Sequence, residues 1–194
     1  MEDIVTKRCA HGRELKNCMG NVCHINNLGR RSREEMWPDA TAFIVWSGGD
    51  DLTEFLKAVD GCIRLDGRSM YPDMMLGQRL FEYDGREWHG EDKVEDDLRK
   101  TMALKAAGYE VWRARDRVPP IDGASNVEVD ARQGSETTSK AVALALGVSE
   151  QAWPALWRRV DSLARRAMLQ LGQKYTQVKQ SSMDEFVTRE QTVP

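Results

Sequence analysis

The chain has 194 residues, of which 41% are hydrophobic and 30% charged, and its formal net charge is −3. This composition is typical of a globular protein and excludes a disordered one. No apolar run approaches the roughly 18 residues that cross a membrane, and the polar N-terminus lacks a signal-peptide pattern, so we expect a cytoplasmic protein. Because the small negative charge gives no global attraction to nucleic acid, any DNA contact requires local basic patches.

Residues 1–30 contain three of the four cysteines. They contain almost no large apolar side chains, so packing alone cannot order them, and zinc held by four sulfur or nitrogen ligands could. We therefore predict a small structural Zn²⁺ module, although reduced cysteines without a role remain the alternative. The candidate ligands are Cys9, His11, Cys18 and Cys23, with His24 as a competing donor and Cys62 as a substitute for His11. Cys62 is otherwise expected to be a small core residue.

Residues 31–60 are predicted to form a helical connector. The arginines at its start, Arg30, Arg31 and Arg33, favour either phosphate contacts or a solvated linker. Residues 41–46 are strongly apolar, Ser47-Gly48-Gly49 predicts a turn, and residues 51–59 have the apolar spacing of a short helix. Residues 62–65 then predict the first strand of a core that spans residues 61–133.

Residues 73–76 and 79–83 predict two strands that are joined by the two-residue turn Gly77-Gln78. If Leu76 pairs with Arg79, then Asp73 lies directly opposite Glu82. Like charges at opposed strand positions are destabilising, so we expect a cation between them.

Side chains alternate along a strand, so Asp84 is predicted to share a face with Glu82 and to complete a cluster of three carboxylates. Hard oxygen ligands of this kind suit Mg²⁺. His89 follows the turn at Gly85 and can reach the same site, where a histidine is a candidate general base for activating water. An ordinary acidic surface hairpin is the alternative interpretation.

The run from Pro72-Asp73 to Glu82-Tyr83-Asp84-Gly85-Arg86-Glu87-Trp88-His89 resembles the core of the very-short-patch repair endonucleases of the PD-(D/E)xK superfamily. The similarity continues through Glu95-Asp96-Asp97-Leu98-Arg99 and Gly108-Tyr109-Glu110-Val111. It implies a restriction-endonuclease-like α/β fold with a mixed sheet flanked by helices. It also implies that Asp73 is the principal metal ligand and that His89 acts near the scissile phosphate. One departure is that the lysine of the superfamily motif would fall at position 84, where this chain has Asp84.

Residues 92–107 predict a helix that Asp92 caps, with acidic residues in its first turns and lysines near its end, as the helix dipole favours. Residues 109–113 predict the next strand, and residues 126–129 an edge strand. The resemblance implies that Arg113 and Arg115 lie near the DNA backbone.

Residues 134–139 predict a polar linker and a boundary, so that residues 134–194 would form C-terminal helices and a polar tail. Apolar residues between Trp153 and Leu171 recur at three- and four-residue spacing, which predicts an amphipathic helix with a packing or homodimer face. Its arginines could follow a DNA backbone or lie on a solvated face. Residues 177–194 are predicted to be frayed.

Two functions are compatible with these patterns. The first is a Mg²⁺-dependent DNA endonuclease of the repair, restriction or mobile-element type. The second is a non-catalytic nucleic-acid-binding or assembly module on a nuclease-like scaffold. The presence of all four candidate catalytic residues favours the enzyme; they are Asp73, Glu82, Asp84 and His89.

Overall fold

The computed structural model describes residues 35–65, 67–86 and 89–190, and the side chains of residues 91 and 173–190 lie outside this description. The chain divides into two compact units, of which one comprises Ser32–Ala167 and the other includes the chain from Met168 onward. All elements below belong to the first unit, except the later part of helix α6. The predicted zinc ligands Cys9, His11, Cys18 and Cys23, as well as Arg30, Arg31 and Arg33, lie outside the described residues.

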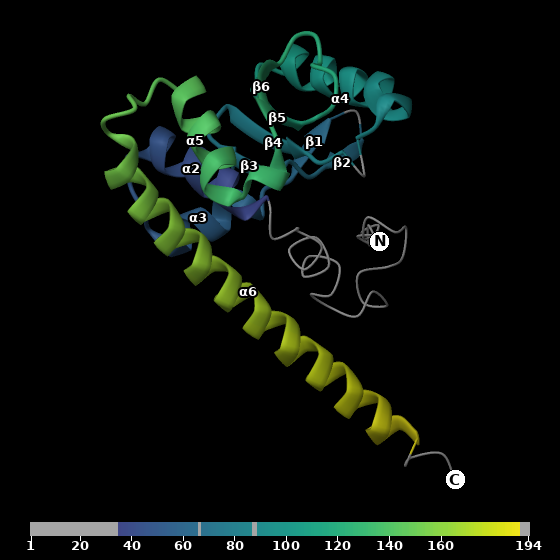
Figure 1. Ribbon diagram of the computed structural model, residues 1–194. Helices are drawn as coiled ribbons and strands as arrows, with labels where there is room; N and C mark the ends of the chain where they lie inside the picture. The colour runs from purple at the N-terminus through teal and green to yellow at the C-terminus, as the bar shows by residue number, and fades with distance from the viewer. Residues whose placement is uncertain (1–34, 66, 87–88, 191–194) are drawn as a thin grey trace. The chain divides into compact units, whose positions relative to one another are not determined.

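A four-stranded mixed sheet forms the centre of this unit, with the strand order β3-β4-β5-β6 (Figure 1). The strands are β3 (Met74–Leu76), β4 (Arg79–Asp84), β5 (Glu110–Asp116) and β6 (Ser125–Val129). Strand β3 is antiparallel to β4, whereas β4, β5 and β6 are parallel. This arrangement confirms the predicted mixed sheet flanked by helices and the predicted edge strand.

The β3–β4 hairpin has the predicted register, in which Leu76 pairs with Arg79 and Met74 with Phe81. Gly77 has a φ of 61°, a left-handed conformation that glycine adopts without a steric penalty. The turn therefore fixes which residues of β4 face each side of the sheet.

Helix α4 (Val94–Ala106) connects β4 to β5 and lies against one face of the sheet. At one end of this face, Leu80, Leu104 and Val111 belong to a buried apolar cluster. Glu82 and Asp84 follow Leu80 at alternate positions, so the same face becomes charged toward the carboxyl end of β4.

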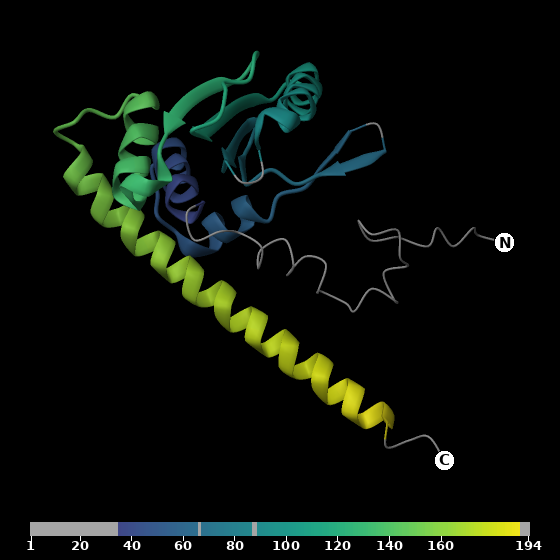
Figure 2. The ribbon, with the colours of Figure 1, turned by 45° about the vertical axis from the view of Figure 1, so that its right-hand side comes forward.

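Helices α2 (Met36–Ser47) and α5 (Ser135–Ala145) lie on the other side of the sheet from α4 (Figure 2). Residues 36–44 of α2 are all buried, as expected for a helix enclosed on all sides. On this side, the rings of Trp46 and Phe81 meet edge to face at 6.4 Å. The sheet is therefore covered on both faces, and α4 alone among these helices covers its charged end.

The predicted break between the first two helices is confirmed. Helix α2 ends at Ser47, and Gly48 follows with a φ of 74°. Helix α3 (Leu52–Val59) begins after Asp51, whose side chain accepts a hydrogen bond of 2.9 Å from the backbone N–H of Glu54. This contact is a side-chain N-cap.

Two predictions about the start of the core were wrong. Strand β1 (Ile63–Leu65) pairs with β2 (Arg68–Met70) in a separate two-stranded sheet and does not join the central one. Cys62 is exposed because the adjacent Ile63 points into the core, and neighbouring strand positions face opposite ways.

The starts of two helices were also predicted incorrectly. Helix α4 begins at Val94, after the short 3₁₀ helix η1 (Glu91–Lys93), so Asp92 does not cap it. The predicted linker at residues 134–139 contains the first turns of α5, which packs on α2 within the same compact unit. Small polar residues are common both in linkers and in the first turn of a helix, which is why composition alone suggested a linker.

Helix α6 (Trp153–Glu190) is longer than predicted and includes residues that were expected to be frayed. Within the first unit, its predicted apolar stripe is a packing face, with Trp153, Val160, Leu163 and Ala164 buried. In the part of the chain that the structure describes, no helix is both long and apolar enough to span a membrane.

Candidate active site

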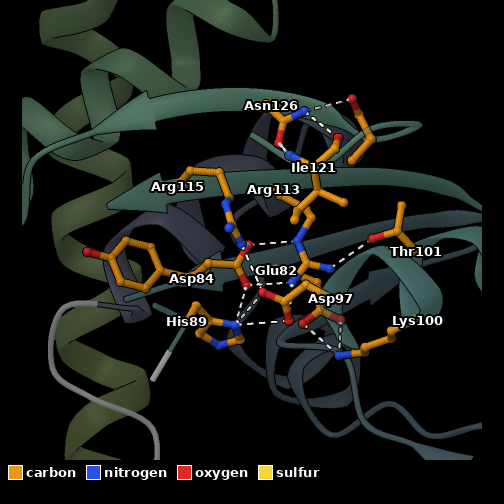
Figure 3. Close-up of polar contacts among 12 residues, drawn as sticks. Glu82, Asp84, His89, Asp97, Lys100, Thr101, Arg113, Arg115, Ile121 and Asn126 are labelled. Atoms are coloured by element: carbon orange, nitrogen blue, oxygen red, sulfur yellow. Dashed lines mark hydrogen bonds and ion pairs between the residues drawn. The ribbon is translucent and has the colours of Figure 1, made fainter. Parts of the chain in front are cut away.

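Charged side chains meet where β4 and β5 approach their carboxyl ends (Figure 3). The parallel register pairs Glu82 with Arg113 and Asp84 with Arg115. These positions lie on the face that α4 covers, and α4 adds its own charged residues there. The two strands contribute Glu82, Asp84, Arg113 and Arg115 to the site. Helix α4 contributes Asp97 and Lys100, and the loop after β4 contributes His89.

Glu82 and Lys100 form a close ion pair at the outer side of this cluster. Lys100 Nζ lies 2.7 Å from Oε1 and 2.9 Å from Oε2 of Glu82, whose side chain is only 5% exposed. Asp73 lies beside them, where its Oδ2 accepts a hydrogen bond of 2.6 Å from the backbone N–H of Tyr83. Lys100 is therefore the ion-pair partner of Glu82, whereas Asp73 is held by the backbone of β4.

Nearby charges shift the pKa values of both Glu82 and Lys100. Burial raises the pKa of Glu82, and the negative charge of Asp73 raises it further, while the charge of Lys100 opposes both. Burial lowers the pKa of Lys100, but the hydrogen bond and charge of Glu82, with the charge of Asp73, leave it raised above its ordinary value. Glu82 is therefore the main partner of the Lys100 ammonium group.

Asp84 is fully buried and has different partners. Arg113 donates to both of its oxygens, from Nε and Nη2, at 2.6 Å each. Arg115 Nη1 donates to Oδ2 at 2.8 Å. Buried charges are stable only when they are paired, and here a carboxylate is held between two guanidinium groups. Asp84 shares a face with Glu82, as predicted, but its oxygens are already occupied by Arg113 and Arg115.

Arg113 and Arg115 do not lie where a DNA backbone contact requires them. Their side chains are 0% and 2% exposed. Besides Asp84, Arg113 donates to Thr101 Oγ1 at 3.0 Å, and Arg115 donates to Asp97 Oδ2 at 3.1 Å. The alternation of β5 correctly placed both arginines on one face, but α4 encloses that face. The expectation that these residues contact phosphates is corrected accordingly.

His89 pairs with Asp97, a residue of α4 that we did not predict as part of the site. His89 Nδ1 lies 2.9 Å from Asp97 Oδ2 and 3.3 Å from Asp84 Oδ1. A proton on Nδ1 satisfies these carboxylates and leaves Nε2 as the ring nitrogen free to act on a substrate. The spacing of residues 97, 101 and 104 on one helical face was a signal that could have identified Asp97.

The pKa values of this pair move in opposite directions. Burial lowers the pKa of His89, but the hydrogen bond to Asp97 and the negative charges of Asp84 and Asp97 outweigh it and raise the pKa above the ordinary value. Burial raises the pKa of Asp97, but the His89 hydrogen bond and the Arg113 charge outweigh this effect and lower the pKa to about 2. Asp97 is therefore a stable anion that orients His89.

Two sets of donors could hold a metal ion. Asp84, His89 and Asp97 offer three ligand atoms that lie within 4.8 Å of one another. Their carboxylates, however, already bind two buried arginines, which supply the compensating charge. Asp73 and Glu82 also offer carboxylate oxygens, which suit Mg²⁺. Glu82 has a single lysine as its ion-pair partner, so its oxygens are less firmly occupied than those of Asp84.

The chain matches no protein-family model, and neither a curated protein nor a solved structure is significantly similar to it.

Proposed function

We propose that the chain is a metal-dependent DNA endonuclease that hydrolyses phosphodiester bonds, with the mixed sheet as a restriction-endonuclease-like core. The observation that carries the proposal is the buried carboxylate of Glu82 on the same face of the sheet as the His89–Asp97 pair, with Asp73 held at the backbone N–H of the adjacent Tyr83. The resemblance of residues 71–115 to very-short-patch repair endonucleases supports the same class of reaction.

Asp73 and Glu82 are the residues that would hold the divalent ion. When bound, Mg²⁺ supplies positive charge that polarises the scissile phosphate and stabilises the charge that develops on it. Asp84, which sequence reasoning had placed in the same ligand set, instead fixes Arg113 and Arg115 beneath the site. Its role in the proposal is to position the neighbouring groups.

His89 is the general base of the proposed mechanism. Asp97 holds the proton on Nδ1 and fixes the ring, so that Nε2 can accept a proton from the attacking water. The side chain of His89 is 27% exposed, in contrast to the fully buried Asp84 beside it. It therefore reaches solvent, as a group that acts on substrate must, whereas Arg113 and Arg115 are enclosed.

The test is cleavage of supercoiled plasmid in MgCl₂ by wild type and by Asp73→Asn. Asparagine retains the oxygen that accepts the Tyr83 hydrogen bond but loses the charge that binds the ion. We expect wild type to cleave and the variant to lose at least about 100-fold in rate, the size of effect that loss of one transition-state contact produces. Asp92→Asn is the matched control, because Asp92 is an exposed carboxylate near the start of α4. Equal rates for all three proteins would contradict the proposal.

A non-catalytic DNA-binding module is the second candidate. It is favoured by the internal neutralisation of the cluster, in which Lys100, Arg113 and Arg115 compensate the buried carboxylates without any ion. A band shift of labelled duplex DNA without cleavage at any concentration of Mg²⁺ or Mn²⁺ would support this candidate over the enzyme.

A further inference from the structure

Lys100 occupies the carboxylate oxygens that a divalent ion would need. Its ammonium group contacts both oxygens of Glu82, at 2.7 and 2.9 Å. The negative charge of Asp73 also raises the pKa of Lys100. An inner-sphere Mg²⁺ ion lies about 2.0–2.1 Å from its oxygen ligands and replaces any hydrogen-bond donor on the same lone pairs. The ion and the ammonium group therefore compete for the same oxygens.

Lys100 is able to leave this position, whereas the arginines of the cluster are not. Its side chain is 30% exposed, and a flexible four-carbon stem carries the charge. Arg113 is 0% exposed and is fixed by two hydrogen bonds to Asp84 and one to Thr101. Within the described cluster, the lysine is thus the cation that can move toward solvent.

The charges favour the same movement. Asp73, Glu82 and Lys100 by themselves carry a net charge of −1, and Arg113 adds positive charge near Glu82. A divalent ion added to the two carboxylates would neutralise them, and the displaced ammonium would then be an extra positive charge at the edge of the site. Mutual repulsion between the two cations would drive the lysine outward.

We propose that Lys100 is a built-in competitor for the divalent ion, which holds Glu82 in the metal-free protein and swings away from it when the ion binds. The inference rests on the proposed function and concerns the regulation of the same site. Binding of the divalent ion is then an exchange in which the ion replaces the Lys100 ammonium group at Glu82. The lysine keeps the buried carboxylate paired while the metal is absent.

Isothermal titration of the full-length protein with MnCl₂ at pH 8.5 tests this exchange. Lys100→Met removes the competing charge and retains the length of the stem, so we expect the dissociation constant for Mn²⁺ to fall about tenfold. Lys100→Arg keeps a cation and is expected to remain within about threefold of wild type. Lys105→Met is the matched control, since it removes an exposed lysine from the last turn of the same helix and is expected to leave Mn²⁺ affinity unchanged.

Circular dichroism would establish that each variant is folded, and Lys100→Gln would replace the methionine variant if that protein does not fold. Unchanged or weaker Mn²⁺ binding by the folded Lys100 variant would overturn the inference, even if wild type binds Mn²⁺ and cleaves DNA. Absence of Mn²⁺ binding by both wild type and the variant would instead refute the proposed metal site, and the inference with it. If Lys100→Met and Lys105→Met both bound Mn²⁺ more tightly, the inference would also be overturned. The tighter binding would then come from the change in the protein's total charge and not from the position of Lys100.

Discussion

Replacement of Asp84 by asparagine tests whether Asp84 is a structural carboxylate or a metal ligand. The two roles predict changes of opposite sign in the free energy of unfolding. In the structure, Asp84 is buried between Arg113 and Arg115, with three contacts of 2.6 to 2.8 Å. Asp84→Asn retains the shape of the side chain but leaves two buried guanidinium groups with one fewer anion. Loss of one partner from a buried ion pair costs about 3–5 kcal/mol, so we expect the free energy of unfolding to fall by about that amount.

Urea denaturation followed by circular dichroism measures this effect. Asp92→Asn serves as the control, because Asp92 is exposed and its only described ion pair, with Lys93, spans 3.6 Å at the surface. That substitution is expected to change stability by less than about 0.5 kcal/mol. If Asp84 instead belonged to an uncompensated acidic cluster that awaits a metal, its removal would relieve repulsion and stabilise the metal-free protein. A gain in stability for Asp84→Asn would therefore refute the ion-pair account.

Three further predictions concern pH and the hairpin. The pKa of His89 is raised in the folded protein. The pairing of His89 with its carboxylates therefore stabilises the protein fully below the unfolded pKa of about 6.5, and this stabilisation is lost as pH rises through the higher folded pKa. The destabilisation caused by His89→Gln should accordingly be larger at pH 5.5 than at pH 9. The pKa of Asp97 is lowered to about 2 in the folded protein, so its contribution to stability is present above the unfolded pKa of 3.8 and is lost as pH falls toward 2. Because Asp97 raises the pKa of His89, Asp97→Asn should lower that pKa in an NMR titration. An unchanged value would contradict the pairing. Gly77→Ala should cost about 1 kcal/mol of unfolding free energy, because φ is 61° there, whereas Gly49→Ala, at a glycine outside that conformation, should cost less.

Local features of the chain were sufficient to predict the hairpin that organises the site. The Gly77-Gln78 turn fixes the register, and the register determines that Glu82 and Asp84 share a face. The cap at Asp51 is equally local, since a side chain and a backbone N–H three residues later form it. In these cases the interacting groups are close in the sequence, so spacing determines the contact.

The partners of the charged residues could not be predicted in the same way. Alternation places Arg113 and Arg115 on one face, but only the docking of α4 determines that the face is enclosed. Asp97 is one of three consecutive acidic residues, and helix polarity explains all three equally well. The position of Lys100 was explained by the helix dipole for the same reason, although its ammonium group pairs with Glu82, 18 residues earlier in the sequence. Tertiary packing determines which of several similar charged residues belong to the buried cluster.

Anomalous scattering from crystals grown with MnCl₂ would show directly where a divalent ion binds. We expect a single strong peak between the carboxylates of Asp73 and Glu82, with Lys100 withdrawn from Glu82. A peak among Asp84, His89 and Asp97, with Arg113 and Arg115 displaced, would contradict this expectation, as would the absence of any peak at millimolar Mn²⁺.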